Sequence, residues 1–276
     1  MRTASEPNGG RRPALLVGLA LVAALVIGVG LFVTWDRVWR TAGPDNPGTQ
    51  CPTVVKAGHR PPLAAVGVDR VMLIGDSIME QPSCTIAAGL SNVGVETWRH
   101  AVSGSGLLNG SVDWVAATRR LLRAEHPDVV VAIFVGNYSQ PYVRDAHGAT
   151  IAPDTPAFFA AWQARAEKLS KLVRASGARM YWVSPPPIAL PPLNHAQRLY
   201  DGYRTIERDH FLDAGRVLAG ANGKEVLKLK TCGARKTVRT VIDGTHLTDD
   251  GSRIYGQQIA HDLTARLGVV TAPRPC

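Results

Sequence analysis

The feature that most constrains the fold of this 276-residue chain is the segment at residues 128–135, which is apolar at every position after Asp128. After its first residue the run reads Val-Val-Val-Ala-Ile-Phe-Val, with β-branched residues at most positions. A strand without alternating polar residues is buried on both faces, which is typical of a parallel sheet covered by helices on either side. The run therefore predicts an α/β domain.

Predicted strands and helices alternate over residues 66–276, the segment assigned to this domain. Strands are expected at residues 70–75, 93–102, 128–135 and 178–184, and helices at 78–90, 112–125, 156–176, 196–211 and 250–267. An irregular strand pair is expected at 215–229, around Asn222 and Gly223. This alternation predicts a three-layer α/β/α domain with a mainly parallel central sheet. Ligands bind such sheets beyond the carboxyl ends of the strands, so the residues after each strand are the candidates for a site.

The N-terminal part of the chain predicts a membrane anchor. Residues 14–34 carry no charge and, as a helix rising about 1.5 Å per residue, can span about 30 Å of hydrocarbon. Three arginines precede the run, so the positive-inside rule places residues 1–13 in the cytoplasm and the domain outside the membrane. Residues 35–65, rich in Pro, Gly and polar residues, are expected to link the anchor to the domain.

A cleaved signal peptide is the alternative interpretation of residues 14–34. The apolar core of a signal peptide is usually about 7 to 15 residues long and precedes a cleavage site between small residues. This run is longer, and no such site follows it, so we expect an uncleaved, single-pass anchor in the cell membrane. Both interpretations place everything after residue 40 outside the cytoplasm.

The chain is basic, with a formal net charge of +9 and a pI of about 9.7. A basic balance suggests an acidic neighbour such as a membrane surface, an anionic envelope polymer or a nucleic acid. The densest basic cluster, residues 224–239, is interleaved with apolar residues and contains no aromatic residue. Nucleic-acid sites combine a basic stripe with stacking aromatic side chains, so we expect a solvated basic surface and no nucleic-acid partner.

The four cysteines are Cys51, Cys84, Cys232 and Cys276. None forms a C-x-x-C motif, so the sequence indicates neither a zinc site nor a redox motif. Outside the membrane, two disulfides are expected, and three connectivities are open. Cys51 and Cys276 lie near the two ends of the part of the chain expected outside the membrane, and one hypothesis is that they pair and join those ends.

The first candidate site residue is Ser77, which follows a predicted buried strand in the sequence Gly-Asp-Ser-Ile and opens a predicted helix. A backbone N–H at the positive end of a helix can stabilise a developing oxyanion. Serine is also a common helix N-cap, and this structural role is the alternative for Ser77.

Two further candidate segments follow the second and third predicted strands. Gly104 and Gly106 lie in the sequence Ser-Gly-Ser-Gly, where glycine lets backbone amides approach a ligand closely. Asn137 follows the apolar run at 128–135 and can donate its side-chain amide to an oxyanion. Taken singly, both segments are more typical of turns.

Asp243 and His246 precede the last predicted helix, in the sequence Asp-Gly-Thr-His. A serine nucleophile needs a base that takes its proton and a carboxylate that orients and stabilises that base. An Asp and a His three residues apart in a tight turn can supply both. The alternative is a polar loop before a helix that Thr248 caps.

Taken together, the order Ser, Gly, Asn and Asp-x-x-His resembles the SGNH hydrolases, also called the GDSL esterase and lipase family. The resemblance runs from about residue 70 to residue 267. It implies a flavodoxin-like SGNH fold in which Ser77 is the nucleophile, His246 the general base and Asp243 its orienting partner. It also implies that neither a metal nor an organic cofactor takes part.

The same resemblance implies an oxyanion hole with three donors. These are the backbone N–H groups of Ser77 and Gly104 and the side chain of Asn137, with Gly106 as the alternative to Gly104. Three residues depart from the family's pattern. Ile78 replaces the usual Leu of the first block, and Val135 and Tyr138 replace a Gly and an Asp on either side of Asn137.

The predicted function is an extracytoplasmic serine esterase or deacylase that removes ester-linked acyl groups from a cell-envelope glycan or lipid. One alternative is an O-acyltransferase that uses the same site with a sugar acceptor, and another is an inert envelope-binding domain. Within the family, the chain resembles extracytoplasmic SGNH domains of actinobacteria, some of which are fused to membrane acyltransferases. The features that carry this resemblance are Cys232, the basic stretch after it and the sequence Asp-Gly-Thr-His-Leu-Thr. This resemblance implies an acylated glycan as substrate and a membrane acyltransferase as partner.

Overall fold

The computed structural model describes residues 51–58, 67–137, 143–145, 147–189, 196–231, 233–240 and 243–268. The predicted anchor at residues 14–34 lies outside these residues. Within them, no helix combines the length and the apolar character that crossing a membrane requires.

A six-stranded sheet forms the centre of the domain, in the order β1-β3-β2-β4-β5-β6. Its strands are β1 (Val54–Val55), β2 (Arg70–Gly75), β3 (Glu96–Ala101), β4 (Val129–Ile133), β5 (Arg179–Val183) and β6 (Phe211–Leu212). All neighbouring strands are parallel except β1, which pairs antiparallel with β3 at the edge. The mainly parallel sheet predicted from the apolar run is therefore confirmed.

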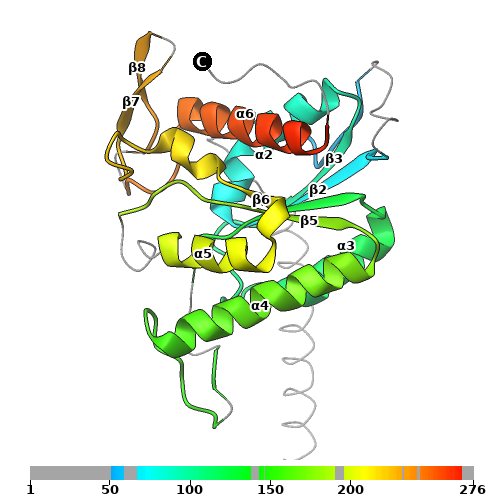
Figure 1. Ribbon diagram of the computed structural model, residues 1–276, viewed down its shortest axis with the longest axis vertical. Coiled ribbons are helices and arrows are strands. Elements are labelled where there is room, and N and C mark those ends of the chain that lie inside the picture. The colour runs from blue at the N-terminus through cyan, green and yellow to red at the C-terminus, as the bar shows by residue number, and fades with distance from the viewer. Residues whose placement is uncertain are drawn as a thin grey trace, which may run out of the picture. The chain divides into compact units, whose positions relative to one another are not determined.

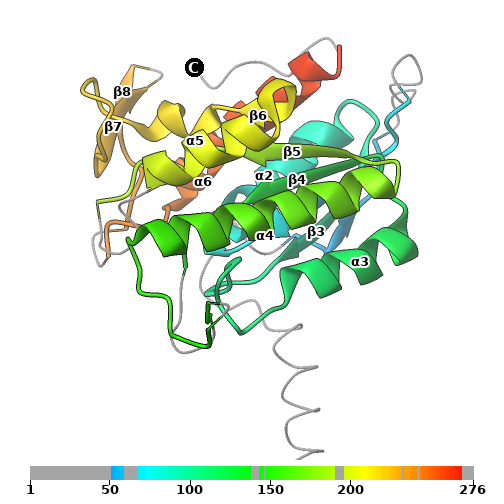
Figure 2. The same cartoon turned by 60° about the horizontal axis from the view of Figure 1, so that its bottom comes forward.

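Helices cover both faces of this sheet. They are α2 (Ser77–Ser91), α3 (Trp114–Glu125), α4 (Pro156–Ala175), α5 (Ala196–Ile206) and α6 (Asp249–Arg266). Figure 1 shows α2 and α6 on one face and α4 and α5 on the other, and Figure 2 shows α3 beside α4. The predicted three-layer α/β/α arrangement is confirmed.

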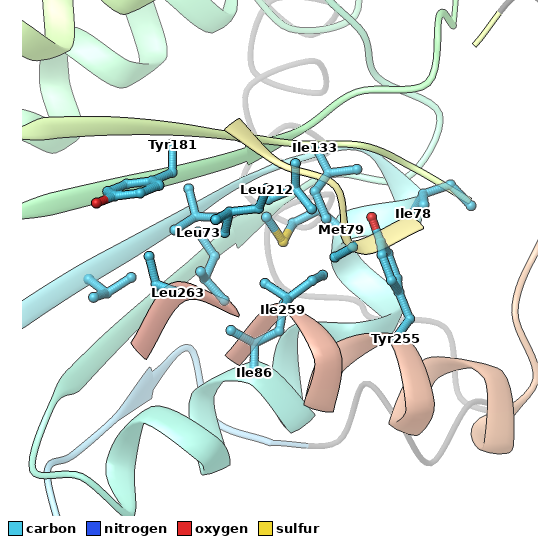
Figure 3. Packing of buried hydrophobic residues seen from close by; sticks show 14 of the residues in the cluster. Leu73, Ile78, Met79, Ile86, Ile133, Tyr181, Leu212, Tyr255, Ile259 and Leu263 are labelled. Atoms are coloured by element: carbon cyan, nitrogen blue, oxygen red, sulfur yellow. The ribbon is translucent and has the colours of Figure 1, made fainter. Parts of the chain in front are cut away.

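Two apolar cores follow from the alternation of side chains along the strands. Leu73 and Val131 point into the core beneath α2 and α6, whereas their neighbours Met72 and Val130 point into the core beneath α3, α4 and α5. All four side chains are fully buried. Figure 3 shows the first core, in which residues from the sheet meet Ile86 of α2 and Ile259 of α6. Both faces are thus covered, as the uninterrupted apolar run of β4 requires.

The structure places the start of the domain earlier than residue 66. Val54 and Val55 pair with Trp98 and Thr97 of β3, so part of the predicted 35–65 linker belongs to the sheet. The Pro- and Gly-rich composition favoured a linker, but a two-residue edge strand is too short to leave a periodic signal in the sequence.

The strand pair predicted at 215–229 was wrong in position. Residues 214–218 form a 3-10 helix, η4 (Ala214–Leu218), and around Asn222 there is only an isolated bridge between Ala219 and Glu225. The hairpin lies further on, as β7 (Lys228–Thr231) and β8 (Ala234–Thr237). The Asn-Gly pair suggested a hairpin turn at 222–223, whereas the chain turns between Thr231 and Ala234.

A disulfide joins Cys51 to Cys84. The hypothesis that Cys51 pairs with Cys276 was therefore wrong. Cys84 lies in α2, and the strand register at β1 brings the segment before Val54 close to that helix. Cys232 and Cys276 lie outside the described residues.

Candidate active site

Ser77 is positioned by a tight passage from β2 into α2. The last residue of β2, Gly75, lies against β4 so closely that a Cβ there would stand 2.2 Å from the carbonyl oxygen of Ile133. The N-cap of α2 is Asp76, whose Oδ1 accepts the N–H of Ile78 at 2.9 Å. Ser77 is the first residue of the helix and not its cap, so its hydroxyl is free for another partner.

That partner is His246, which the sequence places 169 residues away. The Nε2 atom of His246 lies 3.0 Å from the Oγ of Ser77. On the other side of the ring, Nδ1 lies 2.5 Å from Oδ2 of Asp243. The carboxylate accepts the Nδ1 proton, which leaves Nε2 as the acceptor for the serine hydroxyl. The three residues thus form one hydrogen-bonded series from serine through histidine to aspartate, with Ser77 only 7% exposed.

The carboxylate of Asp243 is held by the turn that carries it. Its Oδ1 accepts hydrogen bonds from Thr240 Oγ1 at 2.6 Å, Thr245 N at 2.8 Å and His246 N at 3.0 Å. Partial burial acts to raise the pKa of Asp243, but the hydrogen bonds from His246, Thr240 and the backbone outweigh it and hold the pKa well below its usual range. Asp243 is therefore ionised and fixed beside the imidazole.

Arg239 supports this turn from behind, and sequence reasoning did not single it out. Its side chain is fully buried and donates to the carbonyl oxygens of Thr245 at 2.5 Å and Pro187 at 2.6 Å. Burial lowers the pKa of Arg239, and nearby Glu225 opposes that effect. The guanidinium therefore joins the turn carrying the histidine to the loop after β5. No motif spacing marks Arg239, because its two acceptors are backbone carbonyls.

Asp76 is a second residue that the sequence did not mark. Its carboxylate is fully buried, and Oδ2 accepts Val135 N at 2.8 Å and lies 3.4 Å from Nδ2 of Asn137. Burial raises the pKa of Asp76 to about 7, although hydrogen bonds from Val135 and Ile78 oppose the shift. An Asp before a helix is a recognisable N-cap signal, but its bond to Val135 depends on β2 and β4 being neighbours.

The segment containing Gly104 and Gly106 lies against Asn137. Nδ2 of Asn137 donates to the carbonyl oxygen of Ser105 at 2.8 Å, and a Cβ on Gly106 would stand 2.4 Å from the carbonyl oxygen of Asn137. Gly104 occupies an exposed turn with φ of +72°, where nothing lies within 4 Å of a built Cβ. The backbone N–H groups of Ser77, Gly104 and Gly106 have no hydrogen-bond acceptor among the described residues. The structure thus brings together the segments expected to form the oxyanion hole.

Two residues depart from the family's pattern around Asn137, namely Val135 in place of a Gly and Tyr138 in place of an Asp. Val135 is buried and uses its backbone N–H to bind Asp76, so its side chain fills the core where the family has a glycine. Tyr138 lies outside the described residues. Within the part of the chain that the structure describes, no three His, Cys, Asp or Glu side chains are grouped as metal ligands.

Comparison with solved structures shows the class to which this fold belongs. A G-D-S-L family protein from Desulfitobacterium hafniense, described as lipolytic, has a TM-score of 0.50 at 12% identity, and the match covers 69% of this chain and 97% of that one. An acetylxylan esterase from Geobacillus stearothermophilus, Axe2, has a TM-score of 0.49 at 12% identity, with 80% and 100% covered. An SGNH hydrolase from Slackia heliotrinireducens has a TM-score of 0.47 at 19% identity, with 71% and 100% covered. The first of these likenesses shows that the domain has the fold of a G-D-S-L family protein.

The particular family is identified by sequence. Residues 70–262 match the model of the family described as "Protein of unknown function (DUF459)", and the chain belongs to that family. No curated protein matches the chain.

Proposed function

We propose that the chain is a serine esterase that removes acyl groups from ester substrates through an acyl-enzyme intermediate. The observation that carries this proposal is the hydrogen-bonded series Ser77 Oγ, His246 Nε2, His246 Nδ1 and Asp243 Oδ2, with contacts of 3.0 and 2.5 Å. A serine hydroxyl acts as a nucleophile when a neighbouring base takes its proton and a third group orients that base.

The first step is an attack on the ester carbonyl. The Oγ of Ser77 forms a bond to the carbonyl carbon while its proton passes to Nε2 of His246, and the carbonyl oxygen becomes an oxyanion. The N–H groups of Ser77 and Gly104 and the amide of Asn137 are the proposed donors to this oxyanion. When the tetrahedral intermediate collapses, His246 returns the proton to the leaving alcohol and the acyl group stays on Ser77.

The second step releases the acyl group to water. His246 takes a proton from a water molecule, whose oxygen attacks the acyl-enzyme. As this second intermediate collapses, His246 returns the proton to the Oγ of Ser77, and a free carboxylic acid leaves as product. Asp243 stays ionised throughout and stabilises the imidazolium. With a sugar hydroxyl in place of water, the same step would transfer the acyl group, and product analysis with a glycan acceptor separates the two activities.

The proposed location is outside the cytoplasm, with residues 14–34 as a single-pass membrane anchor. The apolar run and the arginines before it support this topology. The disulfide between Cys51 and Cys84 supports it independently, because such bonds persist in oxidising compartments. In this location an acylated envelope glycan is the proposed substrate and a membrane acyltransferase a proposed partner.

The test is covalent labelling of the full-length chain, purified in mild detergent, with a fluorophosphonate probe and detection by intact mass. We expect one probe per chain and no labelling of a Ser77→Ala variant. Circular dichroism of both proteins controls for folding. A folded wild-type protein that stays unlabelled would contradict the proposal and favour an inert envelope-binding domain.

A further inference from the structure

The β7–β8 ribbon stands beside the candidate site and has no part in the chemistry proposed above. Figure 1 shows it projecting from the body of the domain next to the start of α6. It contains most of the basic cluster at residues 224–239, which the proposed function leaves unexplained. An isolated two-stranded ribbon is only marginally stable in water. The side chains on its two faces therefore indicate what holds this ribbon in place and what it presents to solvent.

The ribbon is joined to the turn that carries His246 by one continuous strand. Beyond β8, Val238 N donates to Leu227 O at 2.8 Å, which extends the ribbon by one pair. The same strand then pairs with the segment after the catalytic turn, where Thr248 N donates to Val238 O at 3.3 Å and Thr240 N to His246 O at 2.9 Å. A ligand held by the ribbon is therefore held in a defined position relative to His246.

One face of the ribbon is fixed to the domain. Leu229 lies directly opposite Lys236 in the strand register, so both side chains are on this face. Leu229 packs against the core beneath α2 and α6, and the Nζ of Lys236 lies 3.4 Å from a carboxylate oxygen of Asp250 at the start of α6.

The opposite face presents three cations to solvent. Lys230 lies directly opposite Arg235, and Lys228 lies two residues before Lys230 on the same face. All three residues are exposed, and none forms an ion pair with a described residue. Like charges directly opposite each other destabilise a strand pair, so this arrangement opposes the pairing of an already marginal ribbon.

We propose that this cationic face, Lys228, Lys230 and Arg235, binds the anionic groups of a polymeric substrate whose ester is presented to Ser77. The proposal rests on the proposed esterase function and names its substrate class: an acylated polymer with carboxylate or phosphate groups along the chain. Thr240, which pairs with His246, lies five positions beyond Arg235, about 16 Å along an extended strand. A polymer of a few units covers that distance, whereas a small ester does not.

The composition of the ribbon favours a polymer over a lipid surface. Elements that bind a membrane interface place Trp, Phe or Leu side chains beside their cations. Neither strand of the ribbon has an aromatic residue. Its one leucine, Leu229, packs inward, and among the described residues the only large exposed hydrophobic side chain is Leu227, at the ribbon's base.

The experiment compares two matched variants of the full-length chain. The first is Lys228→Gln/Lys230→Gln/Arg235→Gln, and the second is Arg119→Gln/Arg120→Gln/Arg123→Gln, which removes three exposed cations from α3 across the sheet. Substrates are O-acetylated polygalacturonate, neutral acetylated xylan and p-nitrophenyl acetate. At low salt we expect the ribbon variant to lose about 10-fold in kcat/KM on the anionic polymer, with little change on the other two. The α3 variant should behave like wild type, and added salt should remove the difference.

Equal losses in both variants would mean that net charge alone matters, and unchanged activity of the ribbon variant on the anionic polymer would remove the binding role. Losses on all three substrates would mean that the substitutions disturb the catalytic turn. A footprint of Lys228 and Lys230 by amine acetylation adds a further outcome. If vesicles with anionic lipid protect both lysines and polygalacturonate does not, the ligand is a membrane and the proposal is wrong.

A binding measurement separates this proposal from the esterase proposal. Ser77→Ala protein should bind unacetylated polygalacturonate in calorimetry, and the same protein with the ribbon substitutions should bind at least about 10-fold more weakly. Binding without any fluorophosphonate labelling of the wild type would leave the ribbon proposal standing and remove the esterase. Labelling of the wild type without any binding of polygalacturonate would leave the esterase proposal standing and remove the ribbon proposal.

Discussion

Asn137 is held by two separate segments of the chain, and this position suits it for oxyanion binding. One N–H donates to Ser105 at 2.8 Å, while the contact to Asp76 is long, at 3.4 Å. The amide can therefore turn a hydrogen toward an oxyanion without losing its anchor. We expect Asn137→Ala to lower kcat about 10²- to 10³-fold with little effect on KM, as measured on p-nitrophenyl acetate. Full activity of a correctly folded variant would show that Asn137 is not an oxyanion donor.

Asp76 gives a prediction about pH and stability. Its folded pKa of about 7 lies above the ordinary value of 3.8. Between pH 3.8 and pH 7, the native state therefore holds a proton on Asp76 that the unfolded state has lost. The contribution of Asp76 to stability is therefore fully present below about pH 4 and is lost as pH rises through 7, a change of at most about 4 kcal/mol.

Replacement by Asn removes this titration. Asp76→Asn should be destabilised at pH 4 because an amide cannot accept from both Ile78 and Val135, and its deficit relative to wild type should shrink as pH rises to 8. Urea unfolding across this range measures the difference. Asp113→Asn, which alters the N-cap of α3, is the control for losing a cap carboxylate. A deficit that is constant with pH would contradict the raised pKa.

At the scale of elements, the loop between β3 and α3 contains two of the glycines that bear on the proposed oxyanion hole. A Cβ at Gly106 would meet the backbone of Asn137 at 2.4 Å, whereas one at Gly104 would meet nothing and strain only the φ angle. We expect Gly106→Ala to reduce kcat/KM about 100-fold and Gly104→Ala to reduce it less than about 10-fold. Comparable losses in the two variants would mean that the contact between Gly106 and Asn137 is not what positions the amide.

At the scale of the whole molecule, the disulfide ties the N-terminal edge of the sheet to α2. The bridge between Cys51 and Cys84 closes a loop over a sequence separation of 33, for which chain entropy gives about 4 kcal/mol. Cys51→Ser/Cys84→Ser should therefore lose roughly 2 to 4 kcal/mol in urea unfolding under non-reducing conditions. Its fluorophosphonate labelling at 25 °C should persist, because the bridge includes neither Asp76, which caps the helix at Ser77, nor His246, which contacts the Ser77 hydroxyl. A double variant as stable as wild type would contradict the bridge.

The sequence was informative where the signal is local. The apolar run at β4 predicted a covered parallel sheet, and the helix boundaries came within a few residues for α2, α4 and α6, because period and cap residues are properties of neighbouring positions. The edge strand β1 and the hairpin β7–β8 were missed or misplaced. Edge strands take their pairing from a neighbour that is distant in sequence, and neither segment contributes a buried apolar run.

What the sequence by itself determined is the set of chemical groups and the order in which parallel strands present them at one edge of the sheet. Only the tertiary structure decided which groups meet. It placed His246 3.0 Å from Ser77 across 169 residues, brought Asp76 to Val135, and put Arg239 behind the turn that carries His246. The contacts of Asp76 and Arg239 use backbone atoms, and all three contacts depend on how distant strands and turns pack, which leaves no pattern in residue types. Local composition can therefore name the candidates for a site, while the geometry that activates them arises only when the sheet assembles.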